Sequence, residues 1–265
     1  MSTDYGDEEL FKQPPKAENC PICHRMLPNL KTGKRFMPCC SKIICFGCEY
    51  AHKQEGRNGC ACCNAELPKG MVGKLHERAD ANNSMAMALL GRMYLYGTDS
   101  VVQDVAKGKK LLLRASELGS VLANTELANM YDHAIHVAQD LKKTTHYLEQ
   151  AAMAGCSHSR YNLGLHDMVL DGRSRLKIKE MPSHTNIHRA IKHWLLACEG
   201  GHPGVLECIK HCFMKGAASE ADYDKALESY LQYLKNVKSA NRDKAEAHND
   251  NELLVFVPRR VFQRR

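Results

Sequence analysis

The hydrophobic and polar positions divide the chain into stretches of different periodicity. From residue 83 to about residue 247, apolar positions recur with the spacing of amphipathic helices, and small residues recur among them at fixed intervals. Residues 19–67 lack a helical period over any useful length and are rich in Cys, Gly and Pro. Residues 1–18 contain few large apolar side chains, which predicts a flexible acidic arm. We therefore expect a small irregular module followed by an all-α region.

The helical stretch contains an internal repeat. The segment from Asp104 to Gly119 recurs from Asp140 to Gly155, at an offset of 36 residues. A third and looser copy ends at Gly201, with about ten extra residues in the loop 172–185, and a fourth copy after residue 220 is degenerate. A helix–turn–helix unit of this length cannot bury its apolar face alone and stacks on its neighbours. The pattern predicts an all-α helical-repeat solenoid over 83–248, reached through a helical linker at 68–82.

Small residues recur at equivalent places in each copy. Three of them allow the first helix of a pair to approach the second: Gly91, Ala128 and Gly164. Three glycines end the second helices, where a left-handed turn is expected: Gly119, Gly155 and Gly201. With these motifs the repeats resemble the Sel-1-like family, which is related to tetratricopeptide repeats. The resemblance implies an α-solenoid that binds a protein client on its concave face and has no catalysis of its own.

The lack of a recognisable targeting signal and the clustering of the cysteines favour a reducing compartment. The longest apolar runs are short, such as Leu253–Val257, and this excludes a membrane-spanning helix and membrane partners. The N-terminus is acidic where a secretory signal needs positive charge followed by an apolar stretch. We therefore expect a cytoplasmic or nuclear protein. The chain has 13 cysteines, nine of them between Cys20 and Cys63, and clustered thiols in such compartments are more often metal ligands than disulfides.

Eight of these cysteines form four pairs with metal-ligand spacing: Cys20–Cys23, Cys39–Cys40, Cys45–Cys48 and Cys60–Cys63. Zinc takes four thiolates in a tetrahedron, and a Cys-x2-Cys turn brings two of them to one ion. Four pairs supply two closed shells, which predicts two structural Zn ions. Eight thiolates and two Zn²⁺ together carry −4, which lowers the formal charge from +7 to +3. This weak basic excess argues against nucleic-acid binding.

The order of the pairs resembles a RING finger, from the opening Cys20-Pro21-Ile22-Cys23 to the closing Cys60–Cys63. RING pairs interleave, and the resemblance implies two zinc shells: Cys20, Cys23, Cys45 and Cys48 in one; Cys39, Cys40, Cys60 and Cys63 in the other. Many RING fingers have histidine where this chain has Lys42, an ammonium donor that cannot ligate. The fourth ligand of the second zinc stays open among Cys39, Cys40 and His52. The implied fold for 19–67 is a small zinc-stabilised α/β RING-like module.

The resemblance implies two alternative functions. In a RING-type ubiquitin ligase, Ile22 would contact a ubiquitin-conjugating enzyme while the repeats hold the client. No residue would do covalent chemistry, so no catalytic residue is assigned and the rate gain comes from positioning. Ala61 and Asn64 stand where family members have a Pro and often an Arg, which favours a catalytically inactive RING-like scaffold. The sequence lacks the phosphate-binding loop, nucleophile elbow and His-Glu-x2-His motifs of other enzymes.

Several other residues have plain structural interpretations. Trp194 is expected in the core between helices. The histidine-rich stretch is expected on a solvated face: His184, His188 and His193. Six further residues would form a third metal site if the fold brought their side chains together: Cys156, Cys198, His202, Cys208, His211 and Cys212. We expect the four cysteines simply to fill helix packing. The basic C-terminal tail at 249–265, with its arginines from Arg259 onward, is expected to leave those charges in solvent.

Overall fold

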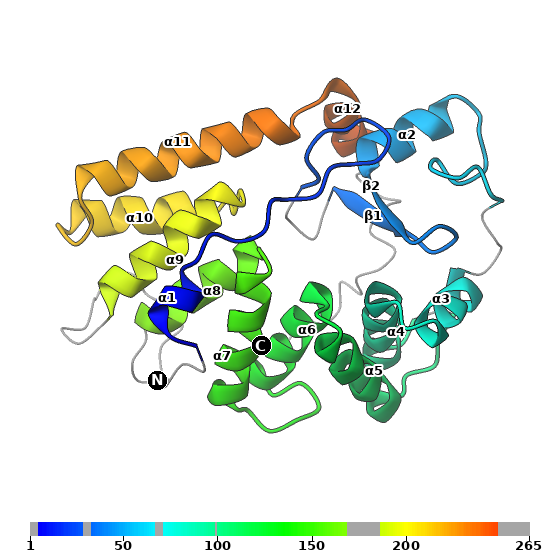
Figure 1. The fold of residues 1–265 in the computed structure, drawn as a ribbon, viewed down its shortest axis with the longest axis horizontal. Helices are drawn as coiled ribbons and strands as arrows, with labels where there is room; N and C mark the ends of the chain where they lie inside the picture. The colour runs from blue at the N-terminus through cyan, green and yellow to red at the C-terminus, as the bar shows by residue number, and fades with distance from the viewer. Residues whose placement is uncertain (1–4, 29–32, 67–70, 99, 169–185, 249–265) are drawn as a thin grey trace. The chain divides into compact units, whose positions relative to one another are not determined.

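The computed structural model describes residues 5–28, 33–66, 71–98, 100–168 and 186–248 (Figure 1). The chain divides into two compact units. The head unit contains residues 18–126 together with 238–248, and the repeat unit contains residues 5–17 and 127–237. The insertion loop at 172–185 and the basic tail at 249–265 lie outside the described residues. Within the described parts, no helix is both long and apolar enough to cross a bilayer.

The cysteine-rich head, residues 19–66, is built on a hairpin and one helix. Strands β1 (Lys34–Met37) and β2 (Lys42–Cys45) pair antiparallel, and α2 (Phe46–Gln54) follows directly. The buried Glu49 joins α2 to β1 through an ion pair of 2.9 Å with Arg35. Among the residues of the head that the structure describes, the buried core contains three apolar side chains other than cysteine: Leu27, Met37 and Ile44.

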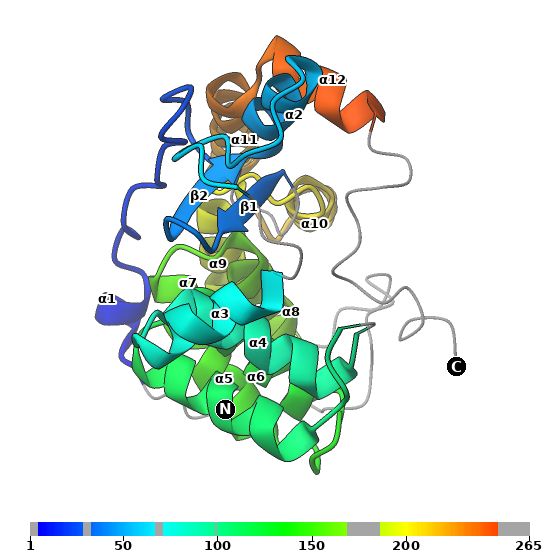
Figure 2. The same cartoon turned by 90° about the vertical axis from the view of Figure 1, so that its right-hand side faces the viewer.

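The C-terminal helix α12 (Ala240–His248) packs against α2, and both views of the ribbon show the two helices side by side (Figures 1 and 2). Gly47 permits this approach, because a Cβ there would lie 2.7 Å from the backbone nitrogen of Arg242. Tyr50 and His248 add an edge-on ring contact with centroids 5.4 Å apart. Residues about 200 positions apart in the chain therefore share one small module.

The rest of the head unit is helical: α3 (Met71–Asp80), α4 (Ser84–Tyr96), α5 (Val105–Glu117) and the start of α6 (Val121–Asp132). Side-chain caps begin two of these helices. The Asn83 carboxamide accepts from Ala86 N at 2.9 Å, and the Asp104 carboxylate accepts from Lys107 N at 2.9 Å. The expected close approach at Gly91 is confirmed, since a Cβ there would lie 2.8 Å from Leu112 Cγ.

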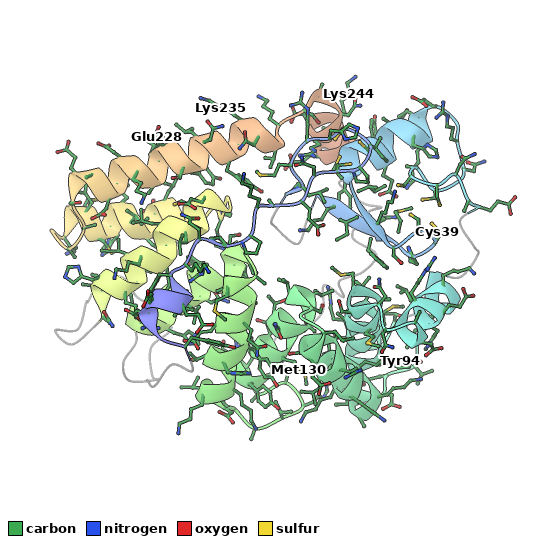
Figure 3. All side chains as sticks on the ribbon, viewed as in Figure 1. Cys39, Tyr94, Met130, Glu228, Lys235 and Lys244 are labelled. Atoms are coloured by element: carbon green, nitrogen blue, oxygen red, sulfur yellow. The ribbon has the colours of Figure 1, made fainter. Side chains whose placement is uncertain are left out.

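The repeat unit stacks helices in chain order after the end of α6. They are α7 (Leu141–Met153), α8 (Ser157–Met168), α9 (Ile187–Glu199), α10 (Val205–Met214) and α11 (Glu220–Val237). Ala128 lies in one buried cluster with Leu148, and Trp194 lies in a second cluster with Ile209. The second cluster confirms that Trp194 is a core residue. On α11, Glu228 and Lys235 extend into solvent (Figure 3).

Three predictions about single residues can be compared with these helices. The three turn glycines have φ of +77°, +91° and +72°, as expected for Gly119, Gly155 and Gly201. The cysteines of the repeats are buried, as expected: Cys156, Cys198, Cys208 and Cys212. The solvated position expected for His193 was wrong: its ring is 1% exposed, because the N-terminal segment packs over this part of α9. His188 is exposed, and His184 lies outside the described residues.

The segment at 1–18, expected to be a flexible arm, contains a short helix in its described part. Helix α1 (Asp7–Leu10) contacts α7, and Leu10 is fully buried. The acidic composition did not reveal this packing, because a single buried leucine in a polar segment has no periodicity.

We predict that Gly164→Ala destabilises the repeat unit. The added methyl group would overlap the indole of Trp194, whose Nε1 donates to Tyr161 O at 3.2 Å. We expect a loss of about 1–3 kcal/mol in unfolding free energy, typical of overpacking. Urea unfolding followed by the fluorescence of Trp194, the single tryptophan, measures it.

The matched control for this prediction is Gly73→Ala in α3, where a Cβ meets no atom within 4 Å. That change is expected to stabilise its helix by up to about 1 kcal/mol, read by circular dichroism. Equal stability of the Gly164→Ala variant and the parent would contradict the close packing at Trp194.

Candidate metal centres in the cysteine-rich head

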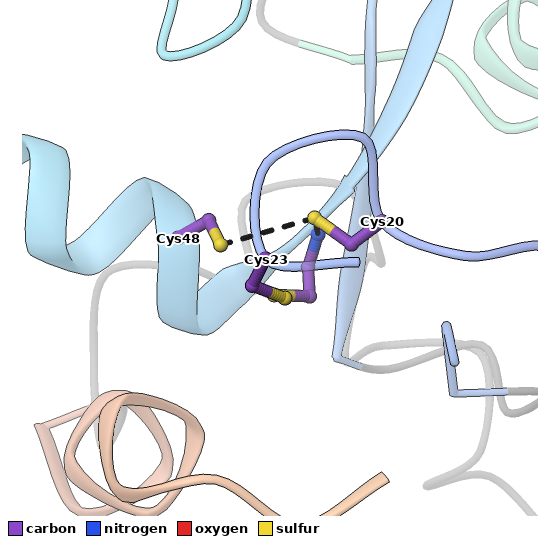
Figure 4. Close-up of side chains that lie close together, drawn as sticks. Cys20, Cys23 and Cys48 are labelled. Atoms are coloured by element: carbon purple, nitrogen blue, oxygen red, sulfur yellow. Dashed lines mark hydrogen bonds between the residues drawn. The ribbon is translucent and has the colours of Figure 1, made fainter. Parts of the chain in front are cut away.

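The first centre brings together Cys20, Cys23, Cys45 and Cys48, whose sulfur atoms all lie within 4.8 Å of one another. The Sγ atoms of Cys20 and Cys48 are 3.8 Å apart (Figure 4). Those of Cys23 and Cys45 are also 3.8 Å apart. A tetrahedron with metal–sulfur bonds of about 2.3 Å has edges of about 3.8 Å. A disulfide would need about 2.05 Å. The spacing fits four ligands around one ion.

The second centre brings together Cys39, Cys40, Cys60 and Cys63, again with all sulfur atoms within 4.8 Å. Cys63 Sγ lies 3.6 Å from Cys39 Sγ. His52, the alternative fourth ligand, is outside this group: its Nε2 lies 3.0 Å from the carbonyl oxygen of Gly59. The structure therefore gathers both Cys39 and Cys40, and each candidate centre consists of four thiols.

Two of the three Cys-x2-Cys segments, Cys20–Cys23 and Cys60–Cys63, form turns with the same backbone hydrogen bonds. In the first turn, Cys20 N donates to Arg25 O at 2.8 Å and His24 N donates to Cys20 O at 2.9 Å. The second turn repeats this with Cys60 N to Ala65 O at 2.7 Å and Asn64 N to Cys60 O at 2.8 Å. His24 and Asn64 both have a positive φ, of 56° and 55°. Each turn thus points two sulfur atoms toward one centre.

The hairpin and α2 supply the remaining thiols. Cys39 and Cys40 lie in the turn between β1 and β2, and Cys45 ends β2. Cys48 follows in the first turn of α2, where the helix N-terminus favours negative charge. One continuous stretch of ten residues therefore contributes to both centres, so the two centres hold each other in place.

The thiols of the first centre differ in how readily they ionise. Burial raises the pKa of Cys48 above its usual range, and the neighbouring Cys45 thiol raises it further. Burial also acts to raise the pKa of Cys20, but hydrogen bonds from the backbone amides of Cys23, Cys45 and Ile22 lower it to about 7. The backbone amides thus favour one thiolate, at Cys20. Four thiolates at this spacing would repel one another and would require a cation between them.

Arginines from outside the cysteine block contact each centre. From α12, Arg242 Nη1 donates to Met26 O at 2.8 Å, and its Nη2 lies 3.8 Å from Cys23 Sγ. From α3, Arg78 Nε donates to Pro38 O at 2.9 Å beside Cys39. Four thiolates on a divalent ion carry a net charge of −2, so a guanidinium beside Cys23 is electrostatically favourable. No spacing signal in the sequence identified either arginine.

The predicted partner-binding residue Ile22 lies between Cys20 and Cys23 and is 37% exposed. Segment 238–248 borders the same turn, because Arg25 Nη1 donates to the carbonyl oxygen of Lys238 at 3.1 Å. Ala61 and Asn64 occupy the second turn. The structure therefore leaves part of an apolar residue on the surface of the first turn, next to the C-terminal helix.

Comparison with known proteins assigns the helical region. Residues 84–120, 121–156 and 157–202 match the Sel1 repeat family. A Sel1 repeat protein from Oxalobacter formigenes has a similar structure, at 19% identity and a TM-score of 0.52, over 77% of this chain and 74% of that one. The protective antigen c5321, present in uropathogenic Escherichia coli strains and displaying an SLR fold, gives 18% identity and a TM-score of 0.49, over 74% of this chain and 38% of that one.

The comparison with curated proteins found no match. The Sel1 matches begin at residue 84 and end at residue 202, so they include the three clear repeats and leave out the cysteine-rich head. Sel1 repeats present stacked helix pairs to other proteins. Residues 84–202 match three consecutive Sel1 repeats, and repeats of this kind suggest a protein-interaction scaffold.

We predict that the full chain binds two metal ions and that Cys20→Ser binds one. Removing one of four ligands opens the first shell, and metal binding supplies roughly 10–16 kcal/mol of folding free energy per structural site. Elemental analysis of purified protein gives the stoichiometry. Cys62→Ser is the control and is expected to keep both ions, because Cys62 belongs to neither group. A parent chain that retains no metal after purification under reducing conditions would contradict both centres.

We also predict that Arg242→Gln speeds metal release from the first centre by about tenfold. The change removes a charged hydrogen bond worth about 1.5–3 kcal/mol beside the thiolates. Release to a colorimetric chelator measures the rate. Lys244→Gln, an exposed position on the same helix (Figure 3), is the matched control. Identical release by both variants would mean that Arg242 does not act on the centre.

Proposed function

We propose that this protein is an intracellular adaptor in which the Sel1 repeats hold a protein client and a zinc-bound RING-like head docks a second protein. The observation that carries the proposal is the interleaving of the two thiol groups. The first centre takes Cys20–Cys23 and Cys45–Cys48, and the second takes Cys39–Cys40 and Cys60–Cys63. This cross-braced order is what the RING resemblance implies.

Zinc is the ion that we propose for both centres. Four thiolates in a closed tetrahedral shell suit zinc in a structural role, because a catalytic zinc keeps an open position. The apolar core of the head is small, with Leu27, Met37 and Ile44 as its buried aliphatic side chains. A core of this size does not hold a module together by itself, so the ions would supply the missing folding free energy. The thiols must stay reduced to bind, which supports a cytoplasmic or nuclear location.

A ubiquitin ligase is the second candidate, and the partial exposure of Ile22 favours it. In this version Ile22 contacts a conjugating enzyme charged with ubiquitin while the repeats hold the client. The chain contributes no nucleophile or general base. Bringing the client lysine close to the thioester raises its effective concentration, which is the source of the rate gain. Ala61 and Asn64 oppose this candidate, because a neutral amide cannot replace a guanidinium donor.

A discharge assay separates the two candidates. Zinc-loaded protein is mixed with a panel of ubiquitin-charged conjugating enzymes, and loss of the thioester is followed over time. If the head only docks a partner, we expect no acceleration by the parent chain and gain of discharge by Ala61→Pro with Asn64→Arg. Restored discharge that is lost again with Ile22→Ala would show that the first turn is the contact.

Discharge by the parent chain that depends on Ile22 would instead establish the ligase. Absence of discharge by every variant, together with binding of no conjugating enzyme, would refute the RING-like docking role. Metal content measured on the same preparations shows that each variant is folded at both centres.

A further inference from the structure

The N-terminal segment is bound to the repeat unit as a peptide would be. Helix α1 lies beside the repeat helices (Figure 1) and contacts α7. Leu10 is fully buried, and the ring of Phe11 lies 4.6 Å from the ring of His193. The segment then passes the turn between α7 and α8, where a Cβ at Gly155 would lie 3.7 Å from Pro14. A short piece of chain, with almost no secondary structure of its own, therefore lies across consecutive repeats.

The surface under this segment is rich in cations. We call it the arm site and define it by six residues of α7, α8 and α9: Glu149, Arg160, Asp167, Arg189, Lys192 and His193. Around the Phe11 ring, the Cζ of Arg160 lies 6.0 Å away, the Cζ of Arg189 5.6 Å and the Nζ of Lys192 5.4 Å from the centroid. The aromatic face attracts these cations.

The arm site also recognises a carboxylate. Arg189 Nη1 forms an ion pair with Asp7. Two acids of the repeat unit hold the other side of this guanidinium: Glu149 at 3.8 Å from Nη2, and Asp167 at 3.4 Å from Nε. Glu149 and Asp167 thus hold Nη2 and Nε of the Arg189 guanidinium, and the third nitrogen, Nη1, faces Asp7. The segment that it meets contains Asp7, Glu8 and Glu9 in sequence.

One cation of the arm site, Arg160, still lacks hydrogen-bond acceptors for two of its nitrogens within the described chain when the N-terminal segment is in place. Arg160 is 2% exposed, and neither its Nε nor its Nη2 has a hydrogen-bond partner among the residues that the structure describes. Burial lowers the pKa of Arg160 to about 10, although Glu149 acts in the opposite direction. A buried guanidinium gains more from a hydrogen-bonded carboxylate than from an aromatic ring. Phe11 covers Arg160 without giving it an acceptor.

We propose that the arm site is the binding site for an acidic segment of a partner protein with a bulky apolar anchor, and that residues 5–17 are its built-in competitor. This inference rests on the proposed role of the repeats in holding a protein client, and it names the chemistry of that client. A tethered competitor has an effective concentration in the millimolar range. It therefore excludes weak ligands and yields to a segment that also satisfies Arg160.

The test uses a fluorescent peptide of residues 5–17 and the full chain in two forms. In the parent, the arm occupies the site. In Leu10→Ala with Phe11→Ala, the arm loses its buried side chains and the site is free. Fluorescence anisotropy is expected to show binding to the double variant at least tenfold tighter than to the parent. Adding Arg189→Glu to the double variant should abolish binding, while Lys210→Glu, an exposed charge on α10, should leave it unchanged.

Two altered peptides test the chemistry. A peptide with Asp7→Asn, Glu8→Gln and Glu9→Gln is expected to bind at least tenfold more weakly. A peptide with Phe11→Glu is expected to bind more tightly, because its carboxylate reaches Arg160. An emission spectrum of Trp194 that matches the parent shows that α9 remains packed in each variant.

Equal binding of the peptide by parent and double variant, or equal binding of the acidic and neutral peptides, would overturn the proposal. A parent chain that is dimeric, and that becomes monomeric with Leu10→Ala and Phe11→Ala, would also overturn it, since the occupant would then be the arm of a second copy. Failure here is distinguishable from failure of the RING-like role, because the arm variants leave the eight thiols and Ile22 untouched.

Discussion

Repulsion among closely spaced thiolates is the constraint on which the head depends. Sulfur atoms 3.8 Å apart cannot all carry negative charge in a partly buried site unless a cation lies between them. The raised pKa of Cys48 expresses this conflict, since burial and the adjacent thiol both oppose its ionisation. A divalent ion in each centre would resolve the conflict, and the hairpin, the two turns and the start of α2 are the scaffold that gathers the eight candidate ligands.

The repeat unit depends on a different kind of interaction. Its helices stack through small residues and buried apolar clusters, as at Gly164 under Trp194. Two segments outside these frameworks supply further contacts. Helix α12 brings Arg242 to the first centre, and the N-terminal segment brings Leu10 and Phe11 to the arm site. Each of these two segments thus acts as an internal ligand of the unit to which it belongs.

Local spacing predicted the repeats, and the resemblance to a RING finger implied which cysteines form each thiol group. The recurrence at 36 residues reports stacked helix pairs, because the same contacts must be made in every copy. Four cysteine pairs in this order imply two four-thiol shells, and the structure brings those same cysteines together. The sequence left the fourth ligand of the second centre open among Cys39, Cys40 and His52, and only distances in the structure distinguish these candidates. His52 contacts Gly59 O, which leaves Cys39 and Cys40 to complete the group.

The sequence by itself determined the elements whose signals are local: helices, turns, repeats and cysteine pairs. The tertiary structure decided what depends on residues far apart in the chain. Arg242 lies 219 positions after Cys23, and Asp7 lies 182 positions before Arg189. A lone arginine on a polar helix, or an aspartate in an acidic arm, has no periodicity that reveals its partner. Folding places Arg242 beside the Cys23 thiol and Asp7 beside the Arg189 guanidinium, and these placements create the candidate sites.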